Sequence, residues 1–232
     1  MEEKSNSKRT KACIKSNFRS VSSKHSEKAA MTAAIIAGGR SRRMKREKAF
    51  LKLGGKALIE RVLEVLCPLF PHVLINSNTP QRFQCWGVPV IPDIVPDRGP
   101  LGGIYTALVH AGTEYVFCVA CDLPFLNPDL ITVLQAEARN CDILVPRTSD
   151  GRHHPLHAVY SKNCLTTIKQ RLQHNQLKIS ELFFFSQLTI HYLDQKQILP
   201  FDPDSKAFMN LNTPDDFRQA CRMEQAVRKK FH

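Results

Sequence analysis

The stretch Ala34-Ile-Ile-Ala-Gly-Gly-Arg-Ser-Arg-Arg-Met44, followed closely by Lys48, joins an apolar strand to a glycine turn and then to clustered cations. Two adjacent glycines let the backbone turn sharply and present its N–H groups to an anion. Arg42, Arg43 and Lys48 add positive charge that suits phosphoryl oxygens. The stretch therefore predicts a buried strand that ends in a polyphosphate-binding loop.

The spacing of this loop differs from that of the two common phosphate-binding motifs. Walker A requires G-x-x-x-x-G-K-[ST], and the dinucleotide fingerprint requires G-x-G-x-x-G. Neither fits, so neither a P-loop ATPase nor an NAD enzyme is expected. The alternative is an ordinary strand-to-helix turn whose basic residues are only solvated, and the three neighbouring cations weigh against it.

The composition is that of a globular protein, with 232 residues, 43% apolar and 23% charged. No apolar run approaches the roughly 20 residues that cross a bilayer, and no secretory leader is evident, so we expect a cytoplasmic location and no membrane partner. Eight cysteines are scattered along the chain, which favours reduced thiols. Cys118 and Cys121 have the spacing of a metal or redox pair, but they lie in an apolar run where structural cysteines are expected.

The net charge of +12 suits nucleic acid, a membrane surface or phosphorylated small molecules. Residues 1–30 carry eight Lys and Arg against three acids and have few large apolar side chains, which predicts a disordered basic tail. The remainder, 31–232, is expected to form one domain. A nucleic-acid module is disfavoured because no aromatic side chains are interleaved on a basic face.

From Met31 onward, short apolar runs alternate with amphipathic ones. This pattern predicts an α/β fold with a mainly parallel sheet and helices on both faces. Strands are expected at 32–37, 72–76, 88–91, 115–121, 142–145, 154–160 and 188–193. Helices are expected at 57–66, 103–111, 128–139 and 162–173, and from Pro214 to near the end.

Polar or glycine residues follow the first four predicted strands. They are Gly38-Gly39, Asn76-Ser-Asn78, Asp93 with the loop Asp97-Arg-Gly-Pro-Leu-Gly-Gly103, and Asp122. In an open α/β sheet, ligands bind outside the carboxyl ends of the strands. Four such segments at one edge predict an active site there.

Asp122 comes directly after an apolar strand, where a carboxylate needs a partner, a hydrogen bond or a metal ion. Its position opposite the phosphate loop suits a Mg²⁺ ligand, although a turn or capping role also fits. Beyond residue 150, the histidines of His153-His154-Pro155 are expected to contact substrate or to lie on the surface. The amides of Asn210-Leu-Asn212 can orient a ligand or tie a turn.

Four motifs together resemble the molybdenum cofactor guanylyltransferase family, a group of Rossmann-like nucleotidyltransferases. Its L-A-G-G-x-S-x-R-M-G-x-D-K is similar to the opening stretch, its G-P-L-[AG]-G-[IML] to Gly99-Pro-Leu-Gly-Gly-Ile104, and its C-D-x-P to Cys121-Asp-Leu-Pro124. Its closing N-x-N-T-P-E-D is similar to Asn210-Leu-Asn-Thr-Pro-Asp-Asp216. The likeness covers nearly all of 31–232 and implies a single three-layer nucleotidyltransferase domain.

The resemblance implies transfer of GMP from GTP to molybdopterin, with release of pyrophosphate and with Mg²⁺ as cofactor. In that reading Ile36, Ala37 and Gly38 bind GTP through backbone, Lys48 meets its phosphates and acts in catalysis, Asn76 and Asp93 hold the nucleoside, and Asp122 is the catalytic metal ligand. Arg152, His153, His154 and Lys162 would then face the anionic pterin. Transient contact with molybdoenzymes or their chaperones would follow, and no nucleic-acid partner.

Two residues depart from the family motif, Lys45 in place of glycine and Glu47 in place of aspartate. They keep a non-catalytic nucleotide- or cofactor-binding relative open as an alternative. A second alternative is a different transfer, with CTP in place of GTP or a sugar phosphate in place of molybdopterin.

Overall fold

The computed structural model describes residues 30–38 and 48–230 of the chain. The predicted basic tail at 1–29 and the loop residues 39–47 lie outside this part, so the expectations for Arg42, Arg43, Lys45 and Glu47 are not addressed by it. Lys48 is the first described residue after the glycine turn.

A seven-stranded sheet lies at the centre of the fold, with the strand order β5-β4-β1-β6-β8-β7-β9. The strands are β1 (Thr32–Ile36), β4 (His72–Asn76), β5 (Val90–Ile91), β6 (Tyr115–Ala120), β7 (Ile143–Arg147), β8 (His157–Ser161) and β9 (Ile190–Asp194). β5, β4, β1 and β6 run parallel, and β7 is parallel to β9. Only β8 is antiparallel to its neighbours within this sheet, so the prediction of a mainly parallel α/β fold is confirmed.

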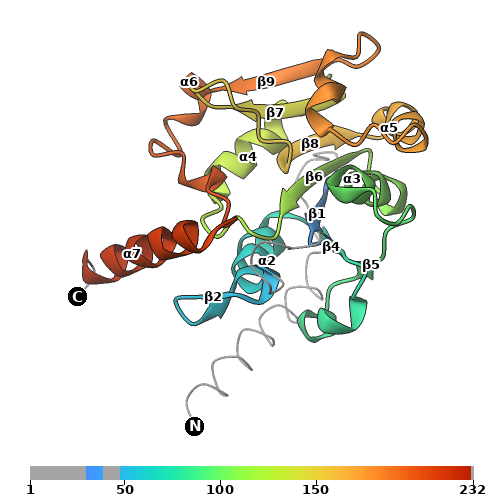
Figure 1. Cartoon of the computed structure of the whole chain (residues 1–232). Helices are drawn as coiled ribbons and strands as arrows, with labels where there is room; N and C mark the ends of the chain where they lie inside the picture. The colour runs from blue at the N-terminus through green and yellow to red at the C-terminus, as the bar shows by residue number, and fades with distance from the viewer. Residues whose placement is uncertain (1–29, 39–47, 231–232) are drawn as a thin grey trace, which may run out of the picture.

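Helices cover both faces of the sheet (Figure 1), with α2 and α4 on one side and α3 and α5 on the other. The α-helices are α2 (Leu58–Leu69), α3 (Gly99–His110), α4 (Pro128–Glu137), α5 (Cys164–Gln173), α6 (Gln195–Ile198) and α7 (Pro214–Lys230). Short 3-10 helices are η1 (Lys48–Phe50), η2 (Pro80–Arg82), η3 (Gln84–Trp86), η4 (Ile179–Phe184) and η5 (Lys206–Phe208). No helix in the described ranges is long and apolar enough to cross a membrane.

The central strand β1 shows why its sequence is apolar throughout. Ala33 and Ile35 pack into the core beneath α2 and α4, whereas Ala34 and Ile36 pack into the core beneath α3 and α5. All four side chains are buried, because helices cover both faces of a parallel sheet. Because both faces of β1 are buried, its sequence lacks the alternation of apolar and polar residues that a half-exposed strand would show.

Local signals explain several element boundaries. Asn127 caps α4 as predicted, since its side-chain oxygen accepts hydrogen bonds from the backbone N–H groups of Asp129 and Leu130. At the start of α7, the Thr213 hydroxyl accepts from the Asp216 N–H at 3.1 Å, which confirms that cap as well. Polar side chains thus cap the starts of both helices at the residues where the sequence places them.

Three expectations about local structure were wrong. Gly99 to Gly103 was expected to be a loop, but it forms the first turn of α3, because Pro100 stands near the helix start where its fixed φ is compatible with a helix. The strand expected at 88–91 is limited to two residues. The hairpin β2 (Lys52–Leu53) and β3 (Lys56–Ala57) was missed, although Gly54-Gly55 between them both have positive φ, as a tight hairpin turn requires.

The contact between α3 and the sheet depends on Gly103. A Cβ atom at this position would lie 2.5 Å from the side-chain oxygen of Asn76 and 3.0 Å from Cγ2 of Ile36. Both neighbours are buried, and Asn76 is held by hydrogen bonds to Ile91 and Asp93. The absence of a side chain therefore sets how closely α3 approaches the carboxyl ends of β1 and β4.

Gly103→Ala is expected to lower the free energy of unfolding by about 1–3 kcal/mol, because overpacking outweighs the roughly 1 kcal/mol that alanine gains over glycine in a helix. Gly112→Ala is the matched control, since a Cβ there meets nothing within 4 Å. Urea unfolding measures both variants. Equal stability of Gly103→Ala and the wild-type protein would contradict the close contact.

Candidate active site

A cavity of about 750 Å³ lies at the edge of the sheet where β1, β4, β5 and β6 end. Six of the seven predicted site residues line it: Ile36, Ala37, Gly38, Lys48, Asp93 and Asp122. The seventh, Asn76, is fully buried behind Asp93. Segments that follow four different strands thus surround one space, as the strand-end pattern predicted.

Lys48 is the residue that joins the distant parts of this cavity. Its ammonium group donates to Asp122 Oδ2 at 2.8 Å and to Asn212 Oδ1 at 2.5 Å. The side chains of Lys48 and Asp122 are only 16% and 13% exposed, so water screens their attraction less than that of a surface pair. The Lys48 ammonium group therefore links η1 to the loop after β6 and to the segment before α7.

Oxygen atoms gather beside this ion pair. The Leu211 N–H donates to the backbone carbonyl of Asp122 at 3.1 Å, which brings Asn210 and Asn212 to the same wall of the cavity. In the described ranges, no group of three or more His, Cys, Asp or Glu side chains could hold a metal ion. One carboxylate with nearby amide oxygens fits Mg²⁺, which takes its other ligands from water and phosphate oxygens.

Asp93 is held in a defined orientation on the opposite wall. Asn76 Nδ2 donates to its Oδ1 at 2.9 Å, and Asn78 Nδ2 donates to its Oδ2 at 2.8 Å. Asn78 also accepts from the Asp93 N–H at 2.8 Å. Asn76 thus supports Asp93 from behind, and Asn78, which the sequence analysis placed in the same polar segment without giving it a role, orients the other carboxylate oxygen. Asn76 and Asn78 are two residues apart at the end of one strand, so both side chains lie on the same face. This spacing was the signal in the sequence that could have assigned Asn78 to the site.

The start of α3 completes this wall. Asp97, Gly99 and Pro100 line the cavity, so the first turn of the helix faces it. Free N–H groups and the helix dipole make such a turn attractive to anions. Asp97 and Gly99 have φ of 59° and 58°, a left-handed conformation that is unusual for Asp97.

Aromatic side chains form the floor beyond Asp122. His154 stacks on Phe208 with ring centroids 4.1 Å apart, and His157 packs edge-on against Phe208 and Phe117. His153 packs against other aromatic rings nearby. We call His154, His157 and Phe208 the aromatic floor. Phe208 and His157 were missed, because a strand histidine and a single phenylalanine carry no distinctive sequence pattern.

Burial keeps both histidines of the aromatic floor neutral. Burial lowers the pKa of His157 to about 3. Burial, together with the positive charge of the nearby Arg152, lowers the pKa of His154 to about 4. His157 is 1% exposed, and neither of its ring nitrogens has a hydrogen-bond partner among the described residues. The floor is therefore uncharged and retains unused hydrogen-bonding capacity.

Two further predictions concern the residues expected to face the pterin and the pair Cys118 and Cys121. Arg152, His153 and His154 line the cavity, but Lys162 does not. Its N–H donates to the carbonyl of Glu114, just before β6, so antiparallel β8 carries it to the opposite edge of the sheet. Cys118, for which a structural role was expected in preference to a metal or redox role, is a buried free thiol whose pKa burial raises.

Comparisons with known proteins agree with this geometry. The family model described as "MobA-like NTP transferase domain" matches residues 33–185. A probable molybdenum cofactor guanylyltransferase of Pelotomaculum thermopropionicum is 37% identical over 198 residues, which cover 85% of this chain and 95% of that protein. The molybdenum cofactor guanylyltransferase of Desulfosudis oleivorans is 35% identical, covering 82% of this chain and 94% of its own length.

A solved structure extends the likeness to the whole fold. The molybdopterin-guanine dinucleotide biosynthesis protein A from Archaeoglobus fulgidus superposes with a TM-score of 0.75 at 28% identity, covering 84% of this chain and all of that one. A nucleotidyl transferase from Methanothermobacter thermautotroptrophicus, at 15% identity and a TM-score of 0.66, shares the fold. The sheet order, the cavity at the strand ends and these matches lead to one conclusion: the chain belongs to the MobA-like NTP transferase family, a family of nucleotidyltransferases.

Proposed function

We propose that the protein transfers GMP from GTP to molybdopterin, giving the guanine dinucleotide form of the cofactor and pyrophosphate. The observation that carries the proposal is the contact of Lys48 with both Asp122 and Asn212 in the cavity. This contact groups a cation, a carboxylate that could ligate a metal ion and an amide, a set of groups that suits a triphosphate. The names of the relatives supply the two substrates.

The nucleotide half of the reaction is assigned to the wall formed by the ends of β1, β4 and β5. The backbone of Ile36, Ala37 and Gly38 borders the cavity and offers polar groups to GTP. Asp93 is oriented by Asn76 and Asn78, so its carboxylate can accept hydrogen bonds from the nucleoside without having to be reoriented. A held acceptor binds with a lower entropic cost than a mobile one.

In this mechanism an oxygen of the terminal phosphate of molybdopterin attacks the α-phosphorus of GTP, and the bond from that phosphorus to the β-phosphate oxygen breaks. Lys48 faces the phosphates and offsets their negative charge, while Asp122 and the neighbouring amide oxygens would hold Mg²⁺. Mg²⁺ supplies positive charge to the phosphoryl oxygens when bound. The contribution of the protein is chiefly to position the two phosphates and to stabilise charge.

We assign the pterin half of the second substrate to the aromatic floor. A flat heteroaromatic ring can stack against the half-buried His154, which lines the cavity, while the buried and neutral His157 supports this wall from behind. Arg152 lies at the same part of the cavity and can meet an anionic group. The two substrates would then approach Asp122 from opposite sides.

Incubation with GTP, Mg²⁺ and molybdopterin, followed by mass spectrometry, tests the proposal. The expected products are the guanine dinucleotide and pyrophosphate. CTP in place of GTP, and a sugar phosphate in place of molybdopterin, serve as comparison reactions. Product from a comparison reaction alone would identify another nucleotidyltransferase, and GTP binding without turnover would identify a non-catalytic relative.

Asp122→Asn is expected to fold normally but to lose turnover, because the amide keeps the shape and one oxygen while removing the charge that holds the metal ion. Asp129→Asn is the matched control, since that carboxylate lies on α4 outside the cavity. Steady-state rates and melting temperatures are measured for both. Turnover of Asp122→Asn at the wild-type rate would exclude the metal-binding role.

Lys48→Met is expected to weaken GTP binding by about tenfold to a hundredfold, as the loss of a charged hydrogen bond of roughly 1.5–3 kcal/mol implies. Lys52→Met removes an exposed lysine of β2 and should leave the affinity unchanged. Isothermal titration calorimetry with GTP and Mg²⁺ measures the affinities. An equal affinity for both variants would show that Lys48 does not contact the phosphates.

Acid is expected to destabilise the fold through His157. Its pKa is about 3 in the folded protein against 6.5 in its usual state, chiefly because of burial. Between these values the unfolded chain binds more protons, so the free energy of unfolding decreases as the pH falls below 6.5. Above pH 6.5 both states are neutral and the effect vanishes.

Urea unfolding at pH 7.5, 6.0 and 5.0 measures this dependence. His157→Leu should make it shallower, because leucine fills a similar space and binds no proton, while His154 keeps its own contribution. His72→Gln alters an exposed histidine of β4 and should leave the dependence as in the wild-type protein. An unchanged pH dependence in His157→Leu would assign the acid sensitivity to other groups.

A further inference from the structure

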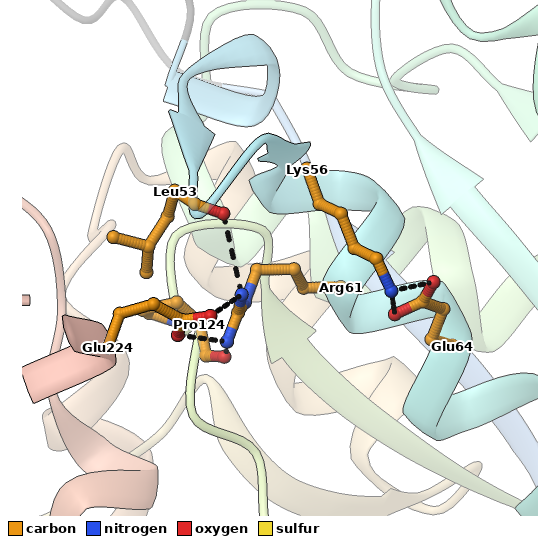
Figure 2. Close-up of polar contacts among 6 residues, drawn as sticks. All are labelled: Leu53, Lys56, Arg61, Glu64, Pro124 and Glu224. Carbon is orange, nitrogen blue, oxygen red and sulfur yellow. Dashed lines mark hydrogen bonds and ion pairs between the residues drawn. The ribbon is translucent and has the colours of Figure 1, made fainter. Parts of the chain in front are cut away.

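Arg61, on the side of α2 that faces α7, lies outside the cavity at a junction of three other segments (Figure 2). Its guanidinium group makes a forked ion pair with Glu224, with Nη2 to Oε2 at 2.9 Å and Nη1 to Oε1 at 3.2 Å. It also donates from Nε to the carbonyl of Pro124 at 3.3 Å and from Nη1 to that of Leu53 at 3.4 Å. One side chain thus connects β2, the loop after β6 and α7.

These are the segments that supply the charged centre of the cavity. β2 follows η1, where Lys48 accepts a backbone hydrogen bond from Leu51 at 3.0 Å. Pro124 stands two residues after Asp122, and α7 begins two residues after Asn212. Side-chain contacts therefore connect this region of the chain at two places. Lys48 makes the contacts inside the cavity, and Arg61 makes those outside it.

A small apolar core joins some of the same segments. It consists of buried side chains from β2, α2, the segment before α7 and α7 itself: Leu53, Leu58, Leu211 and Ala220. This core is separate from the two large cores of the sheet. It has few side chains, so apolar packing alone holds the three segments less firmly than the sheet is held.

We propose that Arg61 is a positioning residue that sets the spacing of Lys48, Asp122 and Asn212; this inference rests on the function proposed above. The side chain satisfies two backbone carbonyls and one carboxylate at the same time. The guanidinium group spreads its five donors over three nitrogen atoms in one rigid plane, whereas the three donors of a lysine ammonium share a single atom and would reach fewer of these acceptors.

A second ion pair, between Lys56 of β3 and Glu64 of α2, is an ordinary surface contact in the same region. Lys56 and Glu64 are 2.7 Å apart, but their side chains are 47% and 31% exposed, and they bond only to each other in Figure 2. Arg61 and Glu224 are 18% and 20% exposed. The Lys56–Glu64 pair therefore serves as a control for the loss of a nearby surface ion pair, because the Lys56 ammonium bonds to the Glu64 carboxylate and to neither Pro124 nor Glu224.

The test compares Arg61→Met, Arg61→Lys and Glu224→Gln with Lys56→Met and Glu64→Gln, at a temperature well below every melting transition. Arg61→Met and Arg61→Lys should lower kcat about tenfold or more and change the KM for GTP less than about twofold, because small displacements affect the transition state more than ground-state binding. Glu224→Gln keeps both carbonyl bonds of Arg61 and should lower kcat only about twofold to threefold. The two control variants should match the wild-type protein.

Hydrogen exchange followed by mass spectrometry provides a readout that needs no turnover. In Arg61→Met, peptides that contain Asp122–Leu126 and Leu211–Thr213 should exchange faster, while those from β1 and β4 should be unchanged. The Leu211 N–H is informative because it bonds to Asp122 directly. Exchange and kcat like those of the controls would overturn the inference.

The outcomes for the two proposals are separable. If the wild-type protein forms the dinucleotide but Arg61→Met has an unchanged kcat, the positioning role fails alone. If the wild-type protein shows no turnover, the proposed function fails, and hydrogen exchange decides whether Arg61 holds the segments. A uniform rise in exchange over the whole chain, with kcat and KM changed together, would reduce Arg61 to a general contributor to stability.

Discussion

The site depends on the register of β1 between two parallel neighbours. Ile36 pairs with Asn76 on one side and with Ala120 on the other, so three strands end at the same level. The residues that follow them, Gly38 and Asp122 among these, consequently lie side by side at one edge. Because both faces of β1 are packed under helices, a shift of this strand by one residue would move buried side chains to the wrong core.

The reversal of β8 sets the second half of the cavity. Antiparallel pairing with β6 brings the start of β8, with His157, to the edge where β6 ends. The chain then returns through η5 and the segment before α7, which adds Phe208 and Asn212 to the lining of the cavity. The edge of parallel strands proposed to bind the nucleotide is thereby extended by residues from the second half of the sequence, an arrangement that suits a reaction between two substrates.

Local chemistry explains which features the sequence could predict. The apolar strands, the caps at Asn127 and Thr213 and the polar strand ends depend on neighbouring residues, and the structure agrees with them. The contact of Lys48 with Asn212 joins positions 164 residues apart, and no local pattern specifies such a partner. The contacts of Arg61 could not be predicted for a related reason, because two of its acceptors are backbone carbonyls, which every residue possesses.

The late position of Asn212 in the chain has a consequence for synthesis on the ribosome. β1, β4 and β6 are all made before residue 121, so the nucleotide edge can form while most of the second half is still untranslated. The amide that meets Lys48, and the helix that Arg61 holds, emerge more than 80 residues after Asp122. All strands of the edge proposed to bind the nucleotide are therefore synthesised well before the residue that completes the contact with Lys48, and this contact can form only after the final segment has been made.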